Sequence, residues 1–92
     1  MKRVYKYPIT AIGGDIFLLS TPKGSKILHI GNQRDGLTAW ALVDSNEGEE
    51  ETHQLLIART GQNIKDPDSQ EYLGTFINTL GSYVLHVFEL KT

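Results

Sequence analysis

Three side chains of this sequence are suited to acid-base or ligand chemistry near neutral pH: those of His29, His53 and His86. The segments 27–30 (ILHI) and 84–87 (VLHV) are near copies, each with an imidazole between apolar residues. If these segments are neighbouring strands, both imidazoles could share a face and bind a metal ion together with Asp44 or Glu89. No His-x-His pair links the histidines, so we expect neither a metal site nor a cofactor. Half-buried imidazoles bonded to neighbouring groups are the simpler interpretation.

The motifs of the common hydrolases and nucleotide-cleaving enzymes are missing. The chain has no G-x-S-x-G elbow and no cysteine, and its carboxylates are concentrated in the polar segment 44–51 (DSNEGEEE). The segment 60–63 (TGQN) lacks the lysine of a phosphate-binding P-loop. We therefore predict a protein that is not an enzyme and has no catalytic residues.

Cationic and aromatic residues could instead bind an anionic, nucleotide-like small molecule without converting it. The candidate ligand-binding residues are Lys6, Tyr7, His29, Arg34, Arg59, Thr60 and His86. Arginine, lysine and imidazole groups pair with phosphates, and aromatic rings stack on bases. Because a chain of this size leaves little room for a deep cavity, we expect such a pocket to be shared between subunits of a homo-oligomer.

The alternative is an interaction protein that binds a host or virion protein through an exposed sheet edge or an aromatic patch, with no small ligand. The positions of the candidate residues distinguish the two hypotheses. Convergence on one concavity favours the small ligand, and dispersal over flat faces favours the protein partner.

Composition limits the class of protein. The 92 residues are enough for one domain, residues 1–92, and 39% hydrophobic with 22% charged residues is typical of a folded globular chain. A net charge of −2 does not favour binding to nucleic acid. The sequence has no apolar run long enough to span a membrane and no apolar segment typical of a signal peptide, so we expect a cytoplasmic protein.

Residue patterns predict an all-β fold. Apolar residues alternate with polar ones, or form short β-favouring runs, in segments 3–9, 15–20, 26–34, 37–43, 52–60, 72–79 and 83–90. Asp35-Gly36 is typical of a two-residue hairpin turn between the third and fourth segments. We expect about seven short, mainly antiparallel strands in a compact sandwich or barrel-like roll, with at most one helical turn at Pro67–Gln70.

The sequence leaves alternatives for three features: the type of element at 72–80, the buried face of 83–90 and the position of Trp40. Apolar residues in 72–80 also fit helical spacing, but poor helix formers such as Gly74 and Asn78 favour a strand. In 83–90, we expect the larger apolar set, which includes His86 and Phe88, to face the core. Trp40 is expected to anchor the core, with a binding surface as the alternative.

Six segments in this order, KRVYKYPI, KILHI, LTAWALVD, ARTGQNI, EYLGTF and LHVFE, together resemble a family of small phage and prophage proteins with no assigned function. The resemblance covers nearly the full length, but Arg59 and Gln62 stand where that family has glycine and histidine. It implies a phage origin and a strand at 72–79. Combined with the small-ligand hypothesis, it implies that the protein sequesters a nucleotide-derived signal and so antagonises host defence.

Overall fold

The computed structural model describes residues 1–10, 16–33, 36–77 and 84–90, and these contain seven strands. The strands are β1 (Lys2–Pro8), β2 (Ile16–Pro22), β3 (Lys26–Gln33), β4 (Gly36–Asp44), β5 (Glu50–Arg59), β6 (Gln70–Ile77) and β7 (Val84–Leu90). A short 3-10 turn, η1, covers Pro67–Ser69. The all-β prediction is confirmed, and the ambiguous segment that begins at Tyr72 is a strand as far as Ile77.

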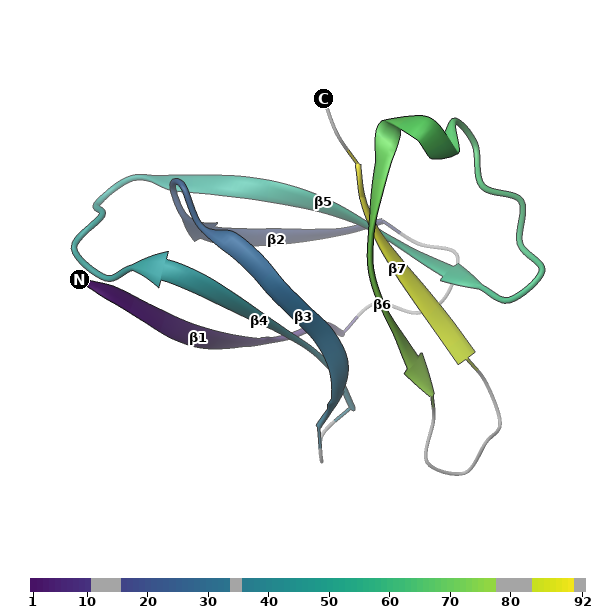
Figure 1. Ribbon diagram of the computed structural model, residues 1–92, viewed down its shortest axis with the longest axis horizontal. Helices are drawn as coiled ribbons and strands as arrows, with labels where there is room; N and C mark the ends of the chain where they lie inside the picture. The colour runs from purple at the N-terminus through teal and green to yellow at the C-terminus, as the bar shows by residue number, and fades with distance from the viewer. Residues whose placement is uncertain (11–15, 34–35, 78–83, 91–92) are drawn as a thin grey trace.

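The strands form two antiparallel sheets. A three-stranded sheet has the order β1-β4-β3, and a four-stranded sheet has the order β2-β5-β7-β6 (Figure 1). Strand β4 is central in its sheet, and none of its nine residues is exposed, in agreement with its nearly unbroken apolar sequence. Pro8, which has no N–H to donate, lies at the end of the edge strand β1.

The two sheets meet at a corner where β3 lies against β6 (Figure 1). The side-chain amide of Asn32 donates to the Ile77 carbonyl at 2.7 Å, and its oxygen accepts from the Ile77 N–H at 3.3 Å. A Cβ atom at Gly74 would lie 2.7 Å from the carbonyl oxygen of Ile30. Only glycine allows the two strands to approach this closely.

The core lies between the inner faces of the sheets. It consists of Ile9, Leu19, Ile27, Ile30, Leu37, Ala39, Leu55, Ile57, Phe76, Leu85 and Val87. Strand β4 contributes small buried side chains such as Ala39 and Ala41, whereas the second sheet contributes larger ones such as Leu55 and Ile57. Small residues opposite large ones fill the space between two packed sheets.

Trp40 lies on the outer face of the three-stranded sheet, because the alternating residues Ala39 and Ala41 point inward. Its ring is half-buried, and its centroid lies 5.6 Å from that of His29. The prediction that Trp40 anchors the core is therefore wrong. An indole in place of an alanine would overfill the space between the sheets.

The face of β7 was also predicted incorrectly. Leu85 and Val87 are buried, whereas His86 and Phe88 lie on the outer face and are only half-buried. Val87 pairs with Ile57, so the register with β5 sends the smaller apolar set inward. The outer face of this sheet also carries apolar side chains, and for that reason the number of apolar residues does not identify the buried face.

One residue of the predicted turn between β3 and β4 lies in a strand. Gly36 pairs with Gln33 at the start of β4, with a φ of 117°, so it lies in the strand ladder and not in the turn. The other predicted turn residue, Asp35, and the candidate ligand residue Arg34 lie outside the described residues.

Candidate functional site

A row of apolar side chains crosses the whole outer face of the four-stranded sheet. The register places Ile16 opposite Leu56, Leu56 opposite Phe88, and Phe88 opposite Tyr72. Directly opposed residues of an antiparallel pair point to the same face. The two outer members, Ile16 and Tyr72, are 54% and 56% exposed, and the two central members are half-buried. We call these four residues the apolar row.

A ring contact fixes one end of the apolar row. The rings of Tyr72 and Phe88 meet edge to face, with centroids 5.5 Å apart and planes at 61°. The Tyr72 hydroxyl is hydrogen-bonded to Oγ1 of Thr75. A tyrosine held in this way can contact a partner at a low cost in side-chain entropy.

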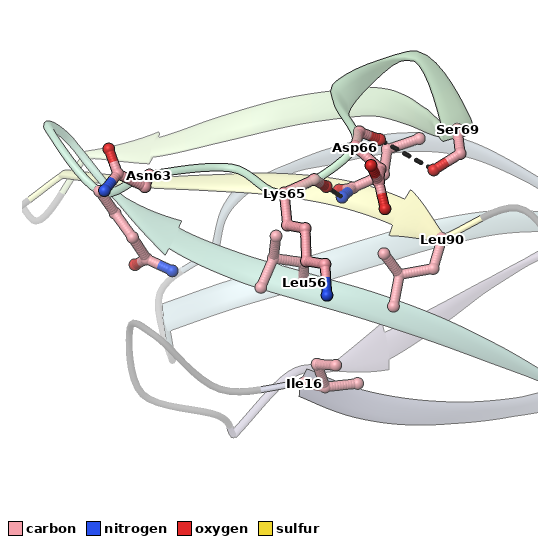
Figure 2. A pocket seen from close by; sticks show the side chains of 9 residues that line it. Ile16, Leu56, Asn63, Lys65, Asp66, Ser69 and Leu90 are labelled. Atoms are coloured by element: carbon pink, nitrogen blue, oxygen red, sulfur yellow. Dashed lines mark hydrogen bonds between the residues drawn. The ribbon is translucent and has the colours of Figure 1, made fainter.

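A pocket of about 390 Å³ lies beside the apolar row, under the segment that connects β5 to β6 (Figure 2). Ile16, Leu56 and Leu90 provide its apolar side chains. Its polar residues are Gln62, Asn63, Lys65, Asp66, Ser69 and Gln70. An apolar surface bordered by polar groups fits an apolar side chain of a partner.

The wall of the pocket is organised around Asp66. This residue has a positive φ of 52°, and Pro67 follows it at the start of η1. The Asp66 carbonyl accepts from the N–H and the hydroxyl of Ser69, at 3.0 and 2.8 Å. The Gln70 side-chain amide donates to the Lys65 carbonyl at 2.7 Å. These bonds connect the pocket wall to the start of β6.

Two of the predicted ligand residues, Thr60 and His86, contact each other on this same outer face. Nε2 of His86 lies 2.7 Å from Oγ1 of Thr60, and Nδ1 lies 3.2 Å from Oγ1 of Thr75. Both ring nitrogens are therefore occupied by hydroxyl groups. Among the described residues, neither nitrogen bonds a carboxylate of the kind that orients the imidazole of a hydrolytic triad.

A second histidine network lies on the inner face. Nδ1 of His53 is 2.6 Å from Oε2 of Glu89, and Nε2 is 2.9 Å from Oγ1 of Thr21. This order of hydroxyl, imidazole and carboxylate matches that of a hydrolytic triad. Thr21, however, is 0% exposed, so a substrate cannot reach its hydroxyl. The network is better suited to holding the strands together than to catalysis.

Sequence reasoning did not select the group formed by Thr21, His53 and Glu89. The sequence does indicate that His53 is buried, because it alternates with Leu55 and Ile57 and therefore shares their face. The pairing of His53 with Glu89 joins residues 36 positions apart and follows from the contact between β5 and β7.

The other predicted ligand residues are distributed over both sheets. Lys6 and His29 are on the outer face of the three-stranded sheet. Lys6 on β1 and His29 on β3 lie opposite Trp40 of the central strand β4, one on each side of it. Nζ of Lys6 donates to the Gln33 side-chain oxygen at 3.2 Å. Tyr7 packs against the core, and this burial raises the pKa of its phenol, as do nearby Tyr5 and Glu50 to smaller extents.

Arg59 is exposed at the end of β5, one residue before Thr60. By alternation along β5, Arg59 shares the face of Leu55 and Ile57, which point into the core, whereas His86 lies on the outer face. Among the described residues, Lys6, Arg59 and His86 therefore do not converge on one concavity.

A family model described as "Domain of unknown function (DUF7352)" matches residues 1–92. No curated protein and no solved structure matches the chain. Within the described ranges, no helical segment has the length and apolarity of a membrane span. In the same ranges, no three metal-ligating side chains of histidine, aspartate or glutamate are grouped so as to hold an ion.

Proposed function

We propose that this chain, which belongs to the DUF7352 family of domains of unknown function, is a non-enzymatic module that binds a partner protein through the outer face of its four-stranded sheet. The observation that carries this proposal is the apolar row, which spans all four strands and remains exposed at both ends. Contiguous exposed apolar surface on a soluble protein is typical of an interaction site.

The surroundings of the apolar row support a protein partner. The pocket next to it combines apolar side chains with polar ones and contains a single cationic residue among those that line it, Lys65. An interface with an apolar centre and a polar rim has this composition. A nucleotide-like ligand needs several donors aimed at one phosphate, and the described cationic residues are distributed over different faces.

The partner would be a host or virion protein in the phage setting that the sequence resemblance implies. Tyr72 is the residue of the apolar row that we expect to contribute most to binding. Exposed tyrosines are enriched among residues whose truncation weakens an interface by about 2 kcal/mol or more.

The test compares Tyr72→Asp with Val4→Asp. Val4 is also 56% exposed, but it lies on β1 of the other sheet, so its substitution adds the same charge outside the proposed site. The tagged protein is isolated gently from cells of its natural source, and bound species are quantified by native mass spectrometry before and after acid denaturation. Circular dichroism verifies that both variants fold.

We expect one stoichiometric polypeptide with the wild-type protein and with Val4→Asp, and at least about a tenfold loss with Tyr72→Asp, which corresponds to about 1.4 kcal/mol. Release of a small molecule in place of a polypeptide would overturn the proposal in favour of ligand sequestration. Equal loss of the polypeptide in both variants would place its binding site elsewhere.

A further inference from the structure

Strand β2 is an end strand whose edge carries no charged side chain. It pairs with β5 on one side and stands at the end of the sheet order β2-β5-β7-β6. Its sequence, IFLLSTP, is uncharged, and Ile16 and Leu18 are 54% and 62% exposed. An end strand presents unpaired backbone N–H and C=O groups, and apolar side chains beside them favour pairing with another strand.

The other end strands of the described structure are protected. Strand β1, which is also seven residues long, carries Lys2, Arg3 and Lys6 and ends at Pro8. Strands β3 and β6 lie against each other, and the Asn32 side chain pairs with the backbone of Ile77. Charges, proline and coverage by another element are the usual ways in which proteins prevent edge pairing. Over residues 16–21, strand β2 has no charge and no proline, and no other described strand pairs with its outer edge.

We infer that β2 is a self-association edge, at which two copies of this chain pair antiparallel about a two-fold axis. The occupant is a second copy because an antiparallel edge is complementary to itself under such an axis. Two four-stranded sheets would then join into one continuous sheet of eight strands.

The sequence of β2 indicates the register. A two-fold axis at Leu18 places that side chain opposite its own copy and Ile16 opposite Ser20 of the second copy. This arrangement covers the most exposed apolar side chain of the strand and leaves Pro22, which lacks an N–H, outside the paired segment. It also places the two apolar rows on the same face of the joined sheet, offset along the strands because Ile16 of each copy lies opposite Ser20 of the other.

The size of the contact indicates how strong the association is. A stable interface buries about 800 Å² on each partner, and one short strand with its flanking side chains supplies less. We therefore expect a reversible dimer whose population rises with concentration.

Cysteine cross-linking tests the register directly, because the chain has no cysteine of its own. Directly opposed residues in an antiparallel pair have Cα atoms about 4.5–5.5 Å apart, which is within the range of a disulfide. Under mild oxidation, Leu18→Cys should form a covalent dimer at least about tenfold faster than Val4→Cys. Val4 is a matched control, since it is 56% exposed on the protected edge strand β1.

Sedimentation of Leu18→Lys provides a second measurement that needs no oxidation. A charge at the centre of the pair should weaken dimerisation at least about tenfold, because two lysines would face each other across the axis, whereas Val4→Lys should leave it unchanged. A wild-type chain that is monomeric at about 1 mM, equal cross-linking of the two cysteine variants, or a dimer insensitive to Leu18→Lys would each overturn the inference.

The inference does not depend on the proposed function. A monomer that retains a Tyr72-dependent partner would reject the β2 dimer and support the partner-binding face. A Leu18-dependent dimer that binds no other polypeptide would support the β2 dimer and reject the partner-binding face.

Discussion

His53 and His86 make nearly the same bonds in two different environments. Each presents Nε2 to a threonine hydroxyl, at 2.9 Å from Thr21 and at 2.7 Å from Thr60. The His53 side chain is 9% exposed on the inner face and bonds the Glu89 carboxylate through Nδ1. His86 is half-buried on the outer face and bonds only hydroxyl groups among the described residues.

The comparison shows that the face of the sheet, and not the residue type, decides what each histidine does. A buried polar group that loses its partner also lacks water, so its contribution to folding is large. On the outer face, water replaces a lost partner at little cost. His53 therefore contributes to the stability of the fold, and His86 belongs to the face that we propose for binding.

The largest expected effect is that of His53→Ala. This change leaves a cavity and removes the partner of both Thr21 and Glu89, so we expect the free energy of unfolding to fall by about 3 kcal/mol. His86→Ala is the matched variant, with an expected loss of about 1 kcal/mol or less. Urea unfolding followed by circular dichroism measures both, and equal losses would contradict the distinction between the two faces.

A smaller effect is expected when only the hydroxyl is removed. Thr21→Val keeps the shape of the side chain but leaves Nε2 of His53 without its bond, which should cost about 1–2 kcal/mol. Thr60→Val removes the corresponding bond on the exposed side and should change the free energy of unfolding by less than about 0.5 kcal/mol. If both variants unfold at the same urea concentration, burial does not control the strength of these bonds.

The smallest effect concerns alkaline pH and the inner face of β1. Burial raises the pKa of Tyr7 above its ordinary value of 10.0, so the unfolded chain loses the phenolic proton first. Tyr7 thus contributes stability that is complete below pH 10 and is lost as the pH rises through the raised pKa of the folded state. Tyr7→Phe should reduce this alkaline loss in thermal unfolding measured from pH 8 to 11. Tyr72→Phe, on the outer face, is the control for removing a phenol, and an equal change in both variants would contradict the role of burial.

Much of the fold was predictable because strand formation depends on local alternation. The strand at Tyr72 was recognised because Gly74 and its neighbours are poor helix formers, although the same segment contains apolar residues at helical spacing. Thr60 and His86 were selected for their chemistry, and the structure brings them into contact. The pocket under the β5–β6 connection was not predicted, because its walls come from that connection and from four strands, β2, β5, β6 and β7, whose order in the sheet differs from their order in the chain.

The sequence by itself determined the class of fold and the approximate number of strands, because both depend on residues that are neighbours in the chain. Only the tertiary structure decided which side of each strand is buried. Trp40 and Phe88 point outward because the sheet opposite already fills the space between the layers. The pairing of His53 with Glu89 and the alignment of the apolar row depend on strand order and register, which arise from contacts between segments far apart in the chain.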